Sequence, residues 1–329
     1  MTKTALITGI FGQDGSYLTE LLHEKGYTIH GIVRRPLSNN AARMADYLSR
    51  KQIPITLHEA NLAIFPEVAN LIKELRPHEC YHLSATHFSS STSAEDRKRI
   101  ASLLYDSNVL SASHLIHALM RHSPETHLIL AGSCLMFEKT TDTTQTEETP
   151  FLSSSTYGLS KIAATELASA YRDQRGLHLS TAILYNHESP RRDISFVTQK
   201  ISRQVVRIKN GSEGYLVLGN LDSQKDWGYA RDYVRGMWLI GQQATASDYI
   251  LASGQAHSVE EFARLAFDAV GLPNWRDYVR IEEALASTTA KTLVGNPAKA
   301  QRQLGWRPTL SFEGLVALMV RCAVQGELD

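Results

Sequence analysis

The stretch TALITGIFGQDGSYLTELLHEKG, residues 4–26, decides the fold of this chain. Residues 4–8 are apolar and β-branched, as a buried strand requires, and three leucines in residues 18–22 recur at the spacing of one helix face. Between them the backbone turns at three glycines, Gly9, Gly12 and Gly15. The stretch therefore predicts a strand, a glycine turn and a helix.

The pattern of strand followed by helix continues along the first half of the chain. Further strands are predicted at 27–33, 55–57, 79–83 and 127–131, and helices at 68–75 and 101–120. Such alternation indicates an α/β fold with a Rossmann-type, doubly wound parallel sheet. Beyond about Asn186 it becomes irregular, with helices predicted at 203–208, 232–243 and 257–270 and a strand at 215–218. We expect a cofactor domain over 1–185 and a smaller α/β substrate domain over 186–329, with some segments crossing back.

Composition excludes several classes of protein. The 329 residues carry 34 Lys plus Arg and 34 Asp plus Glu, so the chain lacks the basic excess of proteins that coat nucleic acid or anionic membranes. Its three cysteines are too few for a disulfide framework and form no C-x-x-C pair, so no metal site is expected. No apolar run approaches the roughly 20 residues of a membrane span, and the N-terminal one is too short for a signal peptide. We expect a soluble cytoplasmic protein.

The glycine turn predicts a dinucleotide site. Glycines let the backbone approach a pyrophosphate, and the helix N-terminus offers free N–H groups and the positive end of its dipole. The spacing, Gly-x-x-Gly-x-x-Gly, is one residue looser than the usual fingerprint. After the second strand, where NAD-binding proteins place an acidic residue, stand Arg34 and Arg35, which suit a 2′-phosphate. NADP(H) is therefore the expected cofactor, and a solvated basic loop is the alternative.

Three residues predict the chemistry. Tyr157 and Lys161 are four apart, so a helix would place them on one face, where an ammonium favours ionisation of a phenol whose ordinary pKa is about 10. Ser133 follows the strand predicted at 127–131, where a hydroxyl can hydrogen-bond a reacting oxygen. Ser, Tyr and Lys in this order after a glycine turn are typical of short-chain dehydrogenases.

Over nearly its whole length the chain resembles the GDP-mannose 4,6-dehydratase branch of the extended short-chain dehydrogenases. Besides residues 5–18 and 30–35, the resemblance is carried by YNHESPRR at 185–192, FVT at 196–198, LGNLD at 218–222, DWG at 226–228, RDYV at 231–234 and LGWRP at 304–308. It implies a Rossmann fold, an NADP cofactor, a nucleotide-diphosphate-sugar substrate and a homo-oligomer, dimer or tetramer. The segment after Arg35 is a candidate for the contact between subunits.

The resemblance also implies site residues by position. Cofactor contacts are expected at Gly9, Gly12, Gln13, Asp14, Gly15, Arg34, Arg35, Asn61, Leu62, Leu83, Tyr157, Lys161, Tyr185, His187 and Arg192. Substrate contacts are expected at Thr86, His87, Asn186, Glu188, Val197, Lys200, Leu218 and Lys225. Arg191 and Arg192 are candidates for a diphosphate or an interface, against a solvated basic loop.

The chain departs from the family where the dehydratase chemistry resides. The family motif resembles Thr-Ser-Glu-Leu-Tyr-Gly, whose Glu is the acid and base of the elimination, whereas residues 133–138 read SCLMFE, with Leu135 in the place of that Glu. A leucine cannot move a proton. Glu138, three residues on, is expected to point elsewhere. Hydride and proton exchange at one carbon remains possible, which is the chemistry of a ketoreductase or of an epimerase working through a transient ketone.

Other departures concern the substrate. His87 and Cys134 are candidate acids or bases for an epimerase, and a backbone-bonded histidine and a buried packing thiol are the alternatives. Lys225 stands where the family has an arginine, and Ala286 and Thr289 replace members of a nucleotide clamp, which puts GDP in doubt.

The leading hypothesis is an NADP(H)-dependent oxidoreductase of deoxysugar biosynthesis that reduces a GDP-linked 4-keto-6-deoxy sugar, with or without epimerisation at a neighbouring carbon. Two alternatives stay open. One is a true GDP-mannose 4,6-dehydratase in which another residue replaces the glutamate, and the other is a catalytically silent cofactor-binding protein. The sequence leaves open the sugar, the base and the direction of hydride transfer.

Overall fold

The first elements follow directly from the opening stretch. In this computed structural model, which describes residues 2–86, 95, 103–282 and 291–329, strand β1 covers Thr4–Thr8 and helix α1 covers Gln13–Glu24, with the glycine turn between them. All of β1 except its first residue is buried, because helices cover both faces of the sheet. The predicted order of strand, turn and helix is confirmed.

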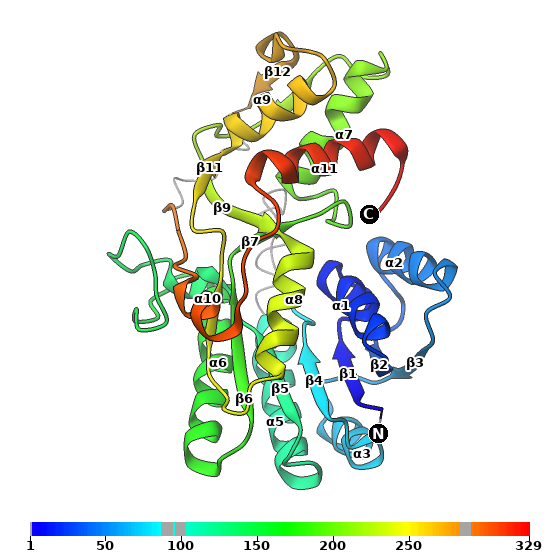
Figure 1. Ribbon diagram of the computed structural model, residues 1–329, viewed down its shortest axis with the longest axis vertical. Helices are drawn as coiled ribbons and strands as arrows, with labels where there is room; N and C mark the ends of the chain where they lie inside the picture. The colour runs from blue at the N-terminus through cyan, green and yellow to red at the C-terminus, as the bar shows by residue number, and fades with distance from the viewer. Residues whose placement is uncertain (1, 87–94, 96–102, 283–290) are drawn as a thin grey trace.

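A seven-stranded parallel sheet forms the base of the molecule in Figure 1, in the order β10-β6-β5-β4-β1-β2-β3. Its strands are β2 (Thr28–Val33), β3 (Ile55–Glu59), β4 (Glu79–His82), β5 (His127–Ala131), β6 (Leu179–Leu184) and β10 (Tyr249–Leu251), besides β1. Every neighbouring pair in it is parallel. The Rossmann-type α/β fold is therefore confirmed.

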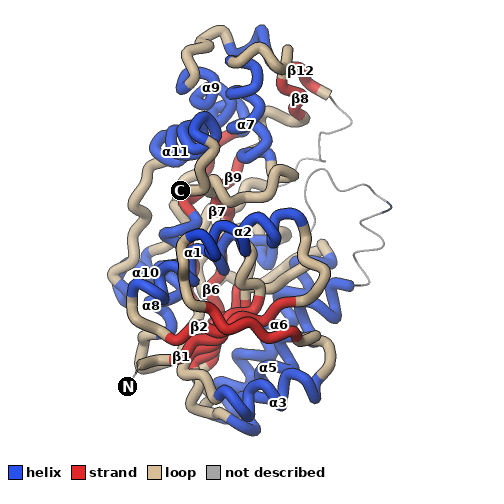
Figure 2. Tube along the Cα trace, turned by 90° about the vertical axis from the view of Figure 1, so that its right-hand side faces the viewer, coloured by secondary structure: helices blue, strands red, loops and turns tan. Residues whose placement is uncertain are grey.

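Helices cover both faces of this sheet, and the sheet separates the hydrophobic core into two clusters (Figure 2). One face packs against α3 (Phe65–Leu75), α5 (Ser111–His122) and α6 (Thr156–Arg175). The other packs against α1, α2 (Asn39–Arg50) and α8 (Ala230–Gly241). Strands buried on both sides lack an alternating polar face, which is why residues 128–131 of β5 read as a continuous apolar run and why all of β6 is buried, Ser180 and Thr181 included.

The chain after β6 builds a second, smaller layer around the carboxyl ends of the strands. A three-stranded sheet, β11-β9-β7, contains β7 (Asn186–Glu188), β9 (Gln224–Tyr229) and β11 (Ala256–Ser258), and a pair joins β8 (Leu216–Leu218) to β12 (Val279–Ile281). Helices α7 (Val197–Lys209), α9 (Val259–Ala269) and α11 (Phe312–Gln325) cover it at the top of Figure 1. From this half, α8, β10 and α10 (Ala298–Leu304) return to the large sheet.

Several predicted helices are present with altered bounds. The helix predicted at 203–208 runs as α7 from 197 to 209. The helix predicted at 257–270 is α9, which begins at a capping box: Ser258 Oγ accepts from Glu261 N at 3.0 Å, and Glu261 Oε2 accepts from Ser258 N at 2.6 Å. Cys80, Cys134 and Cys322 are free and buried. Within the described ranges, no helix combines the length and apolarity needed to cross a membrane.

Candidate active site

The predicted site residues gather at the carboxyl edge of the large sheet. Strands β1, β4, β5 and β6 end side by side there, and the glycine turn, the loop after His82, Ser133 and Tyr185 follow them directly. In Figure 1 this edge faces the second layer. Ligands of open α/β sheets bind in this position, because the loops there diverge and leave a crevice.

The glycine turn packs too closely against neighbouring backbone to admit side chains at Gly9 and Gly15. Gly9 has φ +72°, and a Cβ there would come within 2.8 Å of the Ser84 backbone nitrogen. A Cβ at Gly15 would lie 2.3 Å from the Gly9 carbonyl oxygen. Together with the N-terminus of α1 at Gln13, this surface fits the diphosphate of a dinucleotide. The looser glycine spacing therefore still yields the close backbone approach that the fingerprint requires.

Beside this turn, a buried ion pair joins α1 to β7. His187 Nε2 lies 3.0 Å from Asp14 Oδ2, and Gln13 Nε2 donates to the His187 carbonyl at 3.1 Å. Burial opposes the charge on both partners, yet Asp14 raises the pKa of His187 and His187 lowers the pKa of Asp14. The two residues were predicted separately as cofactor contacts, and the structure brings them together as a pair.

Arg34 and Arg35 follow β2 and are exposed, as contacts to a 2′-phosphate would need to be. The nearest acid recorded for Arg35 is Glu59, with Nε 3.5 Å from Oε2 and both side chains more than half exposed. Asn61 and Leu62 follow the neighbouring strand β3, where Asn61 Oδ1 accepts from the Ala63 nitrogen at 3.0 Å. Two exposed basic side chains thus lie at the end of the second strand, and one of them, Arg35, is paired with Glu59.

Arg191 is no phosphate ligand, which corrects its candidacy. Its side chain is fully buried between the rings of Tyr17 and Tyr47, and it donates to Glu20 Oε2 at 2.5 Å and to Ser16 Oγ at 3.1 Å. Arginine is expensive to bury without a carboxylate, and Glu20 on α1 supplies one. The residue therefore holds the loop after β7 to α1, and sequence patterning could not show this.

Arg192, the next residue, lies in a different environment. Its guanidinium stacks on Phe196 at 3.6 Å, and its Nε is 3.3 Å from Glu188 Oε2 but makes no hydrogen bond. The positive charge of Arg192 acts to lower the pKa of both Asp14 and Tyr157. Of the two arginines, only Arg192 is partly exposed, with 19% of its side chain accessible, and it is paired with Glu188.

The structure brings Ser133, Tyr157 and Lys161 together. Ser133 follows β5 and is near enough to the Tyr157 phenol to lower its pKa. Tyr157 is the second residue of α6, and Lys161 stands one turn later with its Nζ 5.9 Å from the Tyr157 ring centroid. The Lys161 ammonium donates to the Ala131 carbonyl at 2.8 Å. Helix α6 thus presents the phenol and the ammonium on one face, beside the serine.

The pKa of Tyr157 differs from the expectation. Burial raises it to about 12, while hydrogen bonding to Ser133 and the charge of Arg192 lower it only in part. Burial likewise lowers the pKa of Lys161 to about 8. In this structure desolvation outweighs the acidifying effect that was expected from lysine. The phenol is therefore protonated at neutral pH and is suited to donate a proton.

Asn108 belongs to this cluster and was not predicted. It lies in a π-helical turn, residues Tyr105–Leu110, and its Nδ2 donates to Ser160 Oγ at 2.9 Å and to the Thr86 carbonyl at 3.2 Å. Its Oδ1 accepts from the Thr86 nitrogen at 3.1 Å, so Thr86 is held through its backbone. A π-helical turn frequently marks a functional site but has no sequence signature of its own. His87 lies outside the described residues, as do Ala286 and Thr289.

The second layer brings Lys225 of β9 to the other side of the site. Cys134 Sγ is 4.0 Å from Asn186 Oδ1, and Lys225 is near enough for its charge to act on the thiol. Burial raises the pKa of Cys134 to about 12 and lowers the pKa of Lys225. A thiol with so high a pKa stays protonated at neutral pH and cannot act as a base there, so packing remains the simpler account of Cys134.

The remaining predicted contacts are spread over the second layer and the strand ends. Glu188 Oε2 accepts from Thr198 Oγ1 at 2.6 Å, and Lys200 Nζ donates to the Val217 carbonyl at 2.7 Å. Tyr185 is buried, and its hydroxyl donates to Gln145. Val197 begins α7, Leu218 ends β8, and Leu83 follows β4. Glu188 and Lys200 therefore already have partners within the protein.

Leu135 and Glu138 follow Ser133 in the sequence, and their side chains lie in different surroundings. Leu135 is 37% exposed and lies two residues after Ser133. Glu138 turns away from Ser133 and toward residues 153–155, where its Oε2 accepts three hydrogen bonds. The expectation that Glu138 points elsewhere is confirmed.

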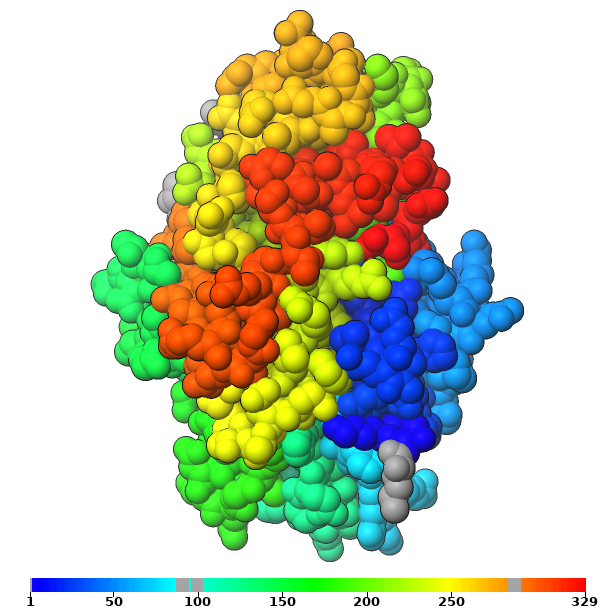
Figure 3. Space-filling view, viewed as in Figure 1, coloured from blue at the N-terminus to red at the C-terminus, as the bar shows by residue number. Residues whose placement is uncertain are grey.

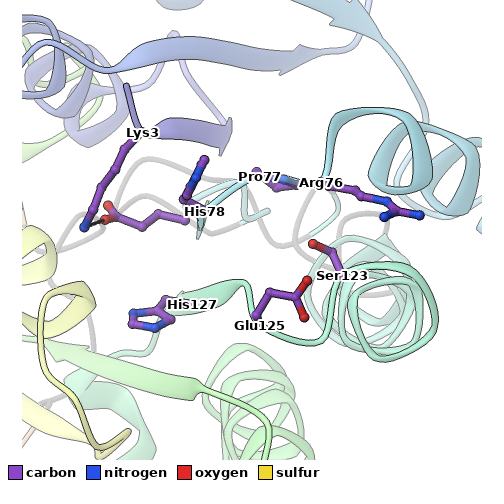
Figure 4. A pocket seen from close by; sticks show the side chains of 8 residues that line it. Lys3, Arg76, Pro77, His78, Ser123, Glu125 and His127 are labelled. Atoms are coloured by element: carbon purple, nitrogen blue, oxygen red, sulfur yellow. Dashed lines mark hydrogen bonds and ion pairs between the residues drawn. The ribbon is translucent and has the colours of Figure 1, made fainter. Parts of the chain in front are cut away.

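A hollow of about 340 Å³ lies at the opposite edge of the sheet (Figure 4). It is lined by Lys3, Arg76, Pro77, His78, Glu79, Ser123, Glu125 and His127. These residues flank the amino ends of the strands and include none of the predicted site residues. The predicted site residues thus lie at the carboxyl edge, away from this hollow.

Comparisons with known proteins show what the whole chain is similar to. A family profile described as GDP-mannose 4,6 dehydratase matches residues 6–319. The chain is 40% identical to GDP-mannose 4,6 dehydratase 1 of Arabidopsis thaliana, covering 97% of this chain and 89% of that protein, and 35% identical to GDP-mannose 4,6-dehydratase of Sinorhizobium fredii, covering 97% and 96%.

Solved structures share the fold. The dTDP-glucose 4,6-dehydratase of Bacillus anthracis, in complex with NAD, superposes with a TM-score of 0.83 at 17% identity over 97% of this chain and 96% of that one. RMD of Pseudomonas aeruginosa, complexed with NADPH, gives 0.77 at 20% identity over 98% and 100%.

Proposed function

The chain belongs to the GDP-mannose 4,6-dehydratase family, and on that premise we propose that it is an NADP(H)-dependent reductase of a GDP-linked 4-keto-6-deoxy sugar. One observation carries the proposal. Ser133, Tyr157 and Lys161 lie together in an arrangement suited to exchange of a hydride and a proton, and Glu138 is engaged elsewhere. The sequence resemblance assigns the place of the dehydratase glutamate to Leu135, which supports the proposal further. The chain keeps the redox half of the family chemistry.

In the proposed reaction the ketone becomes a secondary alcohol. NADPH, when bound, supplies the hydride to the carbonyl carbon. Tyr157 donates its phenolic proton to the carbonyl oxygen, and Ser133 hydrogen-bonds the same oxygen. The Lys161 ammonium stabilises the phenolate that remains until a solvent proton replaces the one donated. The pKa of Tyr157, raised by burial to about 12, favours the donor form required in this direction.

The choice of NADP(H) rests on Arg34 and Arg35 at the end of β2. Their exposed guanidinium groups can pair with a 2′-phosphate, and no acidic residue stands at positions 34–36 to bind ribose hydroxyls instead. RMD, of the same fold, is described with NADPH, whereas the Bacillus anthracis enzyme is described with NAD. Arg34 and Arg35 favour NADPH over NADH as the cofactor of this chain.

Epimerisation beside the ketone is a possible second step. It requires removal of a proton from the neighbouring carbon, and the predicted groups are His87 and Cys134. Burial raises the pKa of Cys134 to about 12, so its thiol is protonated at neutral pH and cannot take up that proton. NMR of the product shows whether the configuration at this carbon is retained or inverted.

GDP-mannose 4,6-dehydratase activity is the second candidate, because relatives 34–41% identical over almost the whole chain carry that name. It requires a substitute for the glutamate at position 135. Asp226 is near Cys134, but its carboxylate accepts from the backbone nitrogens of Ser253, Gly254 and Gly295. It is therefore committed to holding loops.

The deciding experiment has two arms. In the first, the protein is incubated with NADPH and GDP-, CDP-, UDP- or dTDP-linked 4-keto sugars, with NADPH oxidation followed by absorbance and products identified by NMR. In the second, it is incubated with GDP-mannose without added NADPH. Reduction of a GDP-linked 4-keto sugar supports the proposal, whereas formation of a 4-keto product from GDP-mannose overturns it in favour of the dehydratase.

A further inference from the structure

We propose that Glu138 is a positioning residue for the catalytic phenol: it joins the loop that carries Ser133 to the first turn of the helix that carries Tyr157. The inference rests on the proposed function in one respect, that Tyr157 is the proton donor. It goes beyond that function by assigning a role to a carboxylate that stands where the family motif described above ends in glycine. The missing glutamate and this glutamate thus have different tasks.

A single carboxylate oxygen makes the connection. Glu138 Oε2 accepts from Ser153 Oγ at 2.9 Å, from Ser154 N at 3.2 Å and from Ser155 N at 3.1 Å. Two of the three donors are backbone N–H groups just before α6, where a negative charge also interacts favourably with the helix dipole. Three donors converging on one oxygen fix the entry path of the helix more narrowly than a single cap would.

The same serines continue the connection into α6. Ser155 Oγ accepts from Gly158 N at 3.1 Å and so caps the helix whose second residue is Tyr157. Ser153 Oγ also lies 3.2 Å from Ser155 Oγ. Only Thr156 separates Ser155, which caps the helix, from Tyr157, so a displacement of these serines also displaces Tyr157.

The other end of the connection is the loop after β5. Leu152 N donates to the Met136 carbonyl and Lys139 N to the Leu152 carbonyl, each at 2.8 Å. Gly158 packs so closely on this loop that a Cβ would lie 2.6 Å from the Leu135 carbonyl oxygen. Ser133 and Tyr157 therefore sit on two segments that are hydrogen-bonded to each other, and Glu138 contributes three of those bonds.

The charge state of Glu138 is consistent with this role. Partial burial opposes ionisation, yet the bonds from the three serines hold the pKa of Glu138 below its ordinary value. The carboxylate therefore remains ionised, and accepts all three bonds, throughout the pH range in which a reductase is assayed.

The test compares Glu138→Ala and Glu138→Gln with Glu148→Ala, a matched control from the same loop. Glu148 is exposed, and its carboxylate bonds only locally to Thr146. Because displacing a catalytic group by about 1 Å can cost roughly 100-fold in rate, we expect Glu138→Ala to lower kcat by about 10- to 100-fold. KM for NADPH and the melting temperature should stay near those of the control. Glu138→Gln, whose amide oxygen can accept the same bonds, should recover most of kcat.

A second readout does not depend on turnover. In protein labelled with 13C at tyrosine Cζ, the resonance of Tyr157 is identified by its loss in Tyr157→Phe. It should move in Glu138→Ala and stay in place in Glu148→Ala. Movement in the absence of any reductase activity would keep the positioning role while refuting the proposed function. An unmoved resonance, or a loss of kcat that only parallels a loss of folded protein, would overturn the inference.

Discussion

Replacing Arg191 by methionine should destabilise the fold and leave the cofactor site in place. The side chain is fully buried, donates to Glu20 Oε2 at 2.5 Å and to Tyr47 OH at 3.0 Å, and also bonds the carbonyls of Leu328 and Asp329. In Figure 3 the red C-terminal residues lie next to the blue N-terminal segment. The substitution strands the Glu20 carboxylate in a buried site.

The expected magnitude follows from this geometry. Removing one partner of a buried ion pair costs about 3–5 kcal/mol. At about 2.1 cal/mol/K of unfolding entropy per residue, a chain of 329 residues should lose about 4–7 °C in melting temperature. Thermal unfolding followed by circular dichroism measures the shift, and fluorescence titration measures NADPH affinity, which should change less than about threefold because Arg191 reaches no surface that a ligand can contact.

Arg192→Met is the matched control, since it removes the same charge one residue away from a side chain that is 19% exposed. It should weaken NADPH binding and lower the melting temperature by less than Arg191→Met does. Adding Glu20→Gln to Arg191→Met should recover part of the lost stability, because the unpaired carboxylate is removed. If Arg191→Met had the melting temperature of the wild type but bound NADPH poorly, Arg191 would be the cofactor contact and Arg192 the structural residue.

Three further predictions concern the site. Tyr157→Phe should lower kcat by about 10²- to 10⁴-fold, as expected for loss of a general acid, while NADPH still binds in a fluorescence titration; full activity would exclude the phenol as donor. Arg34→Ala with Arg35→Ala should weaken NADPH by about 10- to 100-fold relative to NADH in measured Kd values, because charged hydrogen bonds of about 1.5–3 kcal/mol are lost, and an equal loss for both cofactors would refute the 2′-phosphate contact. The pair of Asp14 and His187 should stabilise the fold most between about pH 4 and pH 6.5. The pKa of His187 is raised in the folded state, so its stabilising free energy is fully present below the ordinary pKa of 6.5 and is lost as pH rises through the folded pKa. The pKa of Asp14 is lowered in the folded state, so its stabilising free energy is present above the ordinary pKa of 3.8 and is lost as pH falls through the folded pKa. Urea unfolding of wild type and His187→Gln across pH checks this, and parallel curves would contradict it.

Local patterns in the sequence determined the parts of the protein that local physics governs. The run of residues 4–8, the glycines after it and the leucines after them specify strand, turn and helix with no help from the rest of the chain. The spacing of Tyr157 and Lys161 places them on one helix face for the same reason. The capping box at Ser258 is equally local, since it joins groups three residues apart.

Tertiary structure alone decided what depends on contacts between distant segments. Arg191 and Arg192 are alike in sequence, and only the packing of α1, α2 and the C-terminal residues buries one and leaves the other near the site. Asn108 meets Ser160 across 52 residues, and β10 joins a sheet begun some 240 residues earlier. Burial and long-range hydrogen bonds set the charge and task of these groups, and neither is a property of a residue and its near neighbours along the chain.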